Sequence, residues 1–301
     1  MSKAEDPAVV VRHVLCARRE GLKRMSYRQQ GPAHAPQGQE GAPSIICVHG
    51  LTRNAHDFDA LGAALAATGR RVLAADVLGR GASDWLADPM GYAVPGYVGD
   101  MMGLIGRATS SPRQDQVDWV GTSMGGLIGL VLAASPISPI RRLVLNDVGP
   151  FLPQAALERI AAYVTAEAPV FDSLEAAEAH YREIHADFGP MTDDDWTALT
   201  RHSTVRTEDG AGWRPHQDPA IGAPAAAMPA HDMDLWDVWD QIACPVLVVR
   251  GARSDLLTPD VAEEMGRRGP GCTVHTVTGA GHAPTFTTPE INRVVVDFLA
   301  G

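Results

Sequence analysis

Hydrophobic and polar positions form two kinds of segment in the first half of the chain. Short, almost wholly apolar runs such as 44–48 and 117–121 predict strands that are buried on both faces of a sheet. Longer amphipathic runs such as 97–107 predict helices that pack on that sheet. Because strand-like and helix-like segments alternate, the pattern favours an α/β fold with a mostly parallel sheet and helices on both of its faces.

The expected strands are 9–17, 23–29, 44–48, 71–76, 117–121, 142–147, 245–250 and 273–277, and the expected core helices are 58–67, 97–107, 124–134 and 292–300. A segment rich in Gly, Pro, Gln and Ala at 30–43 is typical of a loop.

The alternation stops in the middle of the chain. Helical periodicity covers 154–168 and 174–188, and Thr192 followed by three aspartates is typical of the start of a third helix. The Ala- and Pro-rich stretch 222–230 is expected to be irregular.

Because the sheet pattern resumes at Pro245, the middle of the chain has the character of an insertion rather than of an independent domain. We therefore expect residues 1–150 and 239–301 to form one core, and residues 151–238 to form a helical insertion in it.

Composition narrows the classes of function. Among 301 residues, 25 Lys and Arg stand against 36 Asp and Glu, and the resulting charge of −11 with no basic patch argues against a nucleic-acid partner. The four cysteines form no C-x-x-C pair and have no cluster of histidines near them, so no zinc site is expected.

The sequence also bears on location. The longest uncharged apolar run, 124–134, is about half the length of a membrane span. The first residues lack the apolar stretch of a secretion signal. We therefore expect a cytoplasmic protein that does not insert in a membrane.

The pattern G-x-S-x-G occurs at 121–125, between a predicted strand and a predicted helix. That context is typical of a nucleophile elbow, a tight turn that presents a serine hydroxyl above the carboxyl ends of the strands. Small neighbours are needed at such a turn, and Gly121, Gly125 and Gly126 supply them. Ser123 is therefore the candidate nucleophile.

A serine hydroxyl needs a base to remove its proton. Of the histidines that follow Pro245, His275 falls inside a predicted strand, whereas His282 lies in a loop of small residues just after it. His282 is therefore the candidate base.

A carboxylate should orient the base, and it is expected just after a strand. Asp255 follows the strand 245–250 and is the favoured candidate. Asp147, at the end of the preceding strand, is the alternative.

An oxyanion intermediate needs N–H donors. The backbone N–H of Met124, directly after the candidate nucleophile, and that of Leu51, in the loop after the strand 44–48, are the candidates. The side chain of His49 in the same loop is expected to brace the loop through hydrogen bonds.

These motifs together resemble the α/β-hydrolase superfamily. The matching pieces are H-G at 49–50, D-V-L-G-R-G-A-S-D at 76–84, G-T-S-M-G-G at 121–126, Gly251 with Asp255, and G-H at 281–282. The resemblance implies an eight-stranded, mostly parallel sheet and a helical cap at about 151–238. It also implies a mechanism without a cofactor, in which Ser123 forms an acyl-enzyme that His282 and water then hydrolyse.

Ser123 argues against the dehalogenases and epoxide hydrolases of this family, which carry aspartate at the elbow. The favoured function is the hydrolysis of small to medium carboxylic esters, with a small-molecule ester as the partner. The alternatives are a carbon–carbon bond or lactone hydrolase with the same three residues, and a non-catalytic member that binds a small ligand.

Overall fold

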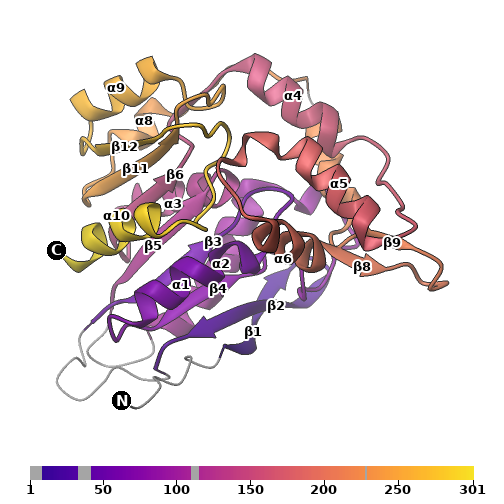
Figure 1. The fold of residues 1–301 in the computed structure, drawn as a ribbon. Coiled ribbons are helices and arrows are strands. Elements are labelled where there is room, and N and C mark those ends of the chain that lie inside the picture. The colour runs from indigo at the N-terminus through magenta and orange to yellow at the C-terminus, as the bar shows by residue number, and fades with distance from the viewer. Residues whose placement is uncertain (1–8, 33–41, 110–114, 228) are drawn as a thin grey trace, which may run out of the picture.

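One eight-stranded sheet organises the fold in the computed structural model, which describes residues 9–32, 42–109, 115–227 and 229–301 (Figure 1). The strand order is β1-β2-β4-β3-β5-β6-β11-β12, and all strands are parallel except β2, which runs antiparallel to β1 and β4. The strands are β1 (Val10–Arg18), β2 (Gly21–Gln30), β3 (Ser44–Val48), β4 (Val72–Ala75), β5 (Val117–Thr122), β6 (Ile140–Asn146), β11 (Val246–Gly251) and β12 (Thr273–Val277). The predicted mostly parallel sheet is confirmed.

Helices cover both faces of this sheet. Alternate residues of β3 enter two separate apolar clusters: Ile46 and Val48 pack with residues of α2 and α3, whereas Ile45 and Cys47 pack with residues of α1 and α10. The double burial explains why the strand is apolar at every position. The core helices are α1 (Asp59–Ala66), α2 (Val94–Ala108), α3 (Met124–Ala133), α9 (Pro259–Arg267) and α10 (Pro289–Ala300), with short 3₁₀ turns η1 (Ala55–Phe58) and η2 (Pro89–Gly91).

Two expectations fall partly or wholly outside the described residues. They are the loop at 30–43, of which 33–41 are not described, and the start of the chain at 1–8. Within the ranges that are described, no helix combines the length and the apolar character that crossing a bilayer requires.

Between β6 and β11 the chain forms a largely helical segment, which we call the inserted segment (151–238). Thr192 caps α6 as predicted, in a reciprocal capping box with Asp195. The segment contains α4 (Gln154–Val164), α5 (Leu174–Ile184), η3 (Ala186–Phe188), α6 (Asp193–Ser203), η4 (Pro219–Gly222), α7 (Ala223–Ala227) and α8 (Trp236–Trp239), and the short strands β7 (Phe151–Leu152), β8 (Thr204–Arg206), β9 (Trp213–Pro215) and β10 (Met233–Asp234). The strand pairs β8–β9 and β7–β10, and the helix α7 in the stretch expected to be irregular, were not predicted.

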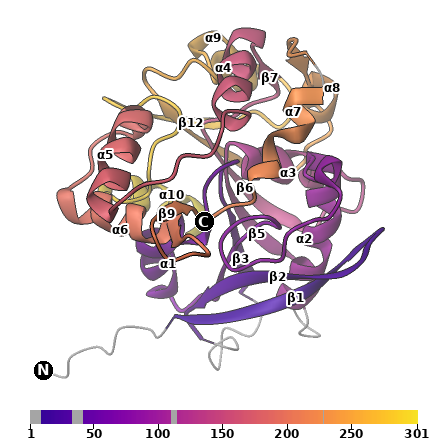
Figure 2. The ribbon, with the colours of Figure 1, turned by 90° about the vertical axis from the view of Figure 1, so that its right-hand side faces the viewer.

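The inserted segment lies over the carboxyl ends of the parallel strands (Figures 1 and 2). Loops that follow three different strands hydrogen-bond to it. After β3, Asn54 donates to the carbonyl of His202; after β4, the N–H of Gly81 donates to His216; and after β12, the N–H of Gly281 donates to Asp187. This is the edge of an open parallel sheet at which ligand sites form.

Two glycines make the turn from β5 to α3 sterically possible. A Cβ atom on Gly125 would lie 2.0 Å from the carbonyl oxygen of Val48, and one on Gly121 would lie 2.3 Å from the carbonyl oxygen of Gly125. Both obstacles are backbone atoms of buried elements, so they cannot move aside as a flexible side chain could.

We predict that Gly125→Ala lowers the free energy of unfolding by about 3 kcal/mol, because the added methyl group must displace β3 or α3. Gly99→Ala in α2 is the matched control: the added methyl meets nothing within 4 Å, and a gain of about 0.5–1 kcal/mol is expected from helix propensity. Urea unfolding of both variants measures the difference. Equal stability of Gly125→Ala and the unmodified protein would contradict the steric argument.

Candidate active site

Ser123 occupies the first turn beyond β5. Its N–H donates to the carbonyl of Asn146 at 2.9 Å, so hydrogen bonding between β5 and β6 continues one residue past the strand. Its φ of 51° turns the chain sharply into α3, and its Oγ lies 2.9 Å from Nε2 of His282. The expected pairing of the candidate nucleophile with the candidate base is thus present in the structure.

His282 lies in the loop after β12, with its side chain largely buried. Its Nδ1 lies 2.8 Å from Oδ2 of Asp147. An ionised carboxylate can only accept hydrogen bonds, so this contact holds the ring proton on Nδ1 and leaves the lone pair of Nε2 facing the serine hydroxyl. The ring is therefore oriented to accept a proton from Ser123.

The carboxylate that contacts the His282 ring is that of Asp147, the alternative candidate, and not that of Asp255, the favoured one. Asp147 is fully buried, and the backbone N–H of Gly251 and the hydroxyl of Ser254 donate to it at 2.8 and 2.6 Å. The Asp255 side chain is 51% exposed and forms a two-point ion pair with Arg159 of α4.

The turn after β11 explains why Asp255 points away. The N–H of Ser254 donates to the carbonyl of Gly251, and the Ser254 hydroxyl accepts from the N–H groups of Leu256 and Leu257 while it donates to Asp147. With Ser254 fixed inward, the next side chain faces outward. Partial burial would raise the pKa of Asp255, but the hydrogen bonds and charge of Arg159 outweigh it and lower that pKa.

Backbone strain occurs at Ser123 and at Asp147. Among the described residues, the non-glycine residues with positive φ are Ser123 and Asp147, at 51° and 57°. Each such conformation costs on the order of 1–3 kcal/mol, and it persists only where the surroundings impose it. Strain of this kind clusters at functional sites, so it agrees with the side-chain geometry.

The two candidate oxyanion donors belong to the turn at Ser123 and to the loop after β3. Met124 is the first residue of α3, and its N–H is among those that have no acceptor within the helix. Leu51 follows Gly50, where an added Cβ would lie 3.8 Å from Cβ of Ser123, so this loop lies against the elbow.

A fully buried arginine contacts both of these residues. Arg80 donates to the carbonyl of Leu51 at 2.8 Å, and one of its nitrogens lies 3.9 Å from the sulfur of Met124. The hydroxyl of Tyr97 lies 2.6 Å from the same guanidinium. Arg80 lies in the motif at 76–84, but no role was predicted for it, and no pattern in the sequence pointed to Ser254.

His49 braces the loop, as expected. Its Nε2 accepts from the N–H of Val77 at 3.0 Å, and its Nδ1 lies 2.7 Å from the carbonyl of Gly50. Burial is the main reason that the pKa of His49 falls to about 3, so the ring stays neutral and serves as a link between the loops after β3 and β4.

The described residues include a group that could hold a metal ion, but it contains none of the residues above. His56, Asp59 and His202 offer ligand atoms that lie within 4.8 Å of one another. None of these three residues contacts Ser123, His282 or Asp147 through a hydrogen bond in the described part of the chain.

Comparisons with known proteins agree with this geometry. The chain is 43% identical over 296 residues to a 3-hydroxybutyrate-oligomer hydrolase from Cupriavidus necator, with 96% of this chain and 97% of the relative covered. It is 30% identical to an esterase from Mycobacterium tuberculosis, with 89% and 88% covered.

A solved structure and a family model extend the comparison. An alpha/beta hydrolase from Novosphingobium aromaticivorans superposes with a TM-score of 0.82 at 32% identity, covering 97% of this chain and 98% of that one. The model of the alpha/beta hydrolase family matches residues 45–291, which contain every residue of the relay. This chain is therefore a hydrolase that belongs to the alpha/beta hydrolase family.

Proposed function

We propose that this protein hydrolyses carboxylic esters through an acyl-enzyme on Ser123, with His282 as the base and Asp147 as the orienting acid. The observation that carries the proposal is the unbroken relay from the Ser123 hydroxyl through the His282 ring to the Asp147 carboxylate, at 2.9 and 2.8 Å. A hydroxyl in contact with an imidazole that a carboxylate orients is the arrangement that nucleophilic acyl transfer requires.

In the first half of the reaction, Oγ of Ser123 attacks the ester carbonyl carbon while its proton passes to Nε2 of His282. Asp147 stabilises the imidazolium that results. The carbonyl oxygen becomes an oxyanion, for which the N–H groups of Met124 and Leu51 are the donors in our assignment. The intermediate then collapses: the bond to the alcohol oxygen breaks, and the alcohol leaves with the proton from His282.

In the second half, His282 takes a proton from water, and the resulting hydroxide attacks the acyl carbon. Collapse of the second tetrahedral intermediate returns the proton to Ser123 and releases the carboxylic acid. The net change is the addition of one water molecule across the ester bond.

We further propose that the esters are short oligomers of hydroxyacyl units, of the 3-hydroxybutyrate type. The relative with this activity in its name matches along nearly the whole length of both chains. An oligomer of this kind offers an ester carbonyl for Ser123 and a secondary alcohol as the leaving group. Both fit the chemistry above without a further catalytic group.

We propose that residues 151–238 act as a cap on a core made of residues 1–150 and 239–301. Beyond the hydrogen bonds described above, two exposed ion pairs link the cap to the loop after β11: Arg159 with Asp255, and Asp187 with Arg253. Exposed pairs of this kind contribute little to stability, so they permit the cap to move.

We predict that Ser123→Ala lowers kcat by about 10⁴-fold or more on p-nitrophenyl butyrate and on a 3-hydroxybutyrate trimer, because the nucleophile is gone. Thermal unfolding should be nearly unchanged, since only one oxygen atom is removed. Ser135→Ala, at an exposed serine, is the control and should keep full activity. Substantial turnover by Ser123→Ala would exclude Ser123 as the nucleophile.

We predict that Asp147→Asn lowers kcat by roughly 10³–10⁴-fold, because an amide can hold the wrong ring proton on His282. Asp255→Asn, which removes only an exposed ion pair, should stay within a few-fold of the unmodified protein. Steady-state kinetics of the two variants on the same ester show which aspartate orients His282. A larger loss in Asp255→Asn would reverse the assignment of the acid.

A substrate panel tests the choice of ester. We expect kcat/KM to be higher for 3-hydroxybutyrate dimer and trimer than for p-nitrophenyl esters, a lactone and a vinylogous diketone. Product analysis by chromatography should give 3-hydroxybutyrate. Preference for the lactone or the diketone would instead support one of the other hydrolase classes with the same relay.

A further inference from the structure

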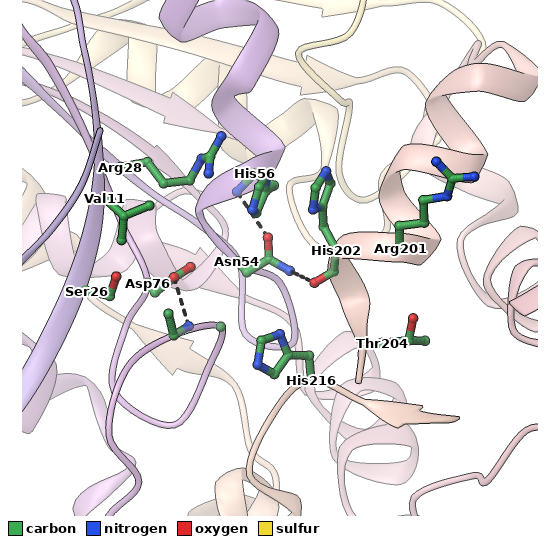
Figure 3. A pocket seen from close by; sticks show the side chains of 12 residues that line it. Val11, Ser26, Arg28, Asn54, His56, Asp76, Arg201, His202, Thr204 and His216 are labelled. Atoms are coloured by element: carbon green, nitrogen blue, oxygen red, sulfur yellow. Dashed lines mark hydrogen bonds between the residues drawn. The ribbon is translucent and has the colours of Figure 1, made fainter. Parts of the chain in front are cut away.

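A cluster of two histidines and one aspartate lies outside the catalytic relay, where the core meets the inserted segment. His56 belongs to η1, Asp59 begins α1, and His202 lies near the end of α6. Figure 3 shows the rings of His56 and His202 side by side at a pocket. They stack with centroids 3.5 Å apart and planes 8° from parallel.

The ligand atoms of this cluster are already close together. Nδ1 of His56 lies 2.8 Å from Oδ2 of Asp59, and one ligand atom from each of the three residues lies within 4.8 Å of the other two. Ligands of one tetrahedral zinc ion lie about 3.4 Å apart, given metal–ligand bonds of about 2.1 Å. A metal ion lies in the plane of each imidazole that binds it, so the two rings, which are now parallel, would rotate about their Cβ–Cγ bonds to bind one ion together.

We propose that His56, Asp59 and His202 form a binding site for one late first-row transition-metal ion, such as Zn²⁺ or Ni²⁺, that bridges the core and the inserted segment. Two imidazoles and one carboxylate favour these ions over Mg²⁺ and Ca²⁺, which prefer oxygen ligands alone. The adjoining pocket, with a cavity of about 250 Å³, gives the ion and its remaining water ligands access. This inference does not depend on the proposed ester hydrolysis.

Two arginines set the strength of the site. Arg28 pairs with both oxygens of Asp59, at 2.9 and 3.2 Å, and Arg201 lines the same pocket. Their positive charge opposes a cation, so binding is expected to be reversible rather than permanent. Removal of the charge of Arg28 should strengthen it.

The proposed metal site lies where the loop after β3 meets the end of α6, so a bound ion should stabilise this contact. Beside the stacked rings, Asn54 donates to the carbonyl of His202 at 3.0 Å, and Arg53 donates to the hydroxyl of Ser203 at 3.0 Å. A bound ion would add a third link between the loop after β3 and the end of α6. The ion needs ligands from the core and from the inserted segment, so it binds only the folded protein. Its binding should therefore raise the melting temperature.

The test is calorimetric titration of untagged, chelator-treated protein with ZnCl₂, NiCl₂ and MgCl₂. We expect saturable binding of one Zn²⁺ or Ni²⁺ per chain, no comparable Mg²⁺ binding, and a rise in melting temperature with Zn²⁺. His202→Gln should weaken Zn²⁺ binding at least tenfold and abolish the rise. His231→Gln, at an exposed histidine outside the cluster, is the matched control and should change neither result.

The Arg28→Gln variant should bind Zn²⁺ several-fold more tightly, because it lacks the positive charge of Arg28 that competes with the ion for the Asp59 carboxylate. Circular dichroism of each variant without metal establishes that it is folded. Equal affinity of folded His202→Gln and unmodified protein would overturn the inference, as would the lack of saturable binding in the unmodified protein. Unchanged affinity in Arg28→Gln would remove Asp59 from the ligand set.

Discussion

Hydrogen bonding between neighbouring parallel strands continues past the ends of β5 and β6, and the site depends on this continuation. The N–H of Ser123 donates to the carbonyl of Asn146, and the N–H of Asp147 donates to that of Val249 at 2.7 Å, so Ser123 and Asp147 are each held one residue beyond a buried strand. Both residues then leave the sheet with positive φ. Rigid strands therefore fix two of the three groups, and only His282 is placed by a loop. Preorganisation of this kind lets a reaction proceed without rearrangement of its catalytic groups.

The sequence was sufficient to predict the sheet, the turn at Ser123 and the pairing of Ser123 with His282, for reasons that are local. A strand such as β3, buried on both faces, must be apolar at every position, and a turn such as 121–125 admits only small residues beside the serine. His282 could be chosen because it follows a strand and lies among small residues. Each of these inferences needed only a few neighbouring positions.

Neighbouring sequence positions could not decide between Asp147 and Asp255. Both follow a strand, and the difference lies in which side chain of the turn after β11 faces inward. Ser254 takes the inward position because its hydroxyl satisfies a carboxylate and two backbone N–H groups at once. The pairing of His56 with His202 is equally invisible, because it depends on how α6 packs against η1. Strands of two or three residues, such as β7 and β8, are too short for a periodic pattern.

Backbone hydrogen bonds join the loop that carries His282 to η3 of the inserted segment. Gly281 donates to Asp187 at 2.6 Å, and Thr285 donates to Phe188 at 3.2 Å, so the loop is tethered on both sides of the histidine. Under the mechanism proposed above, a bulky ligand that displaced η3 would also move His282 away from Ser123. A substrate small enough to leave η3 in place would keep the contact between these two side chains.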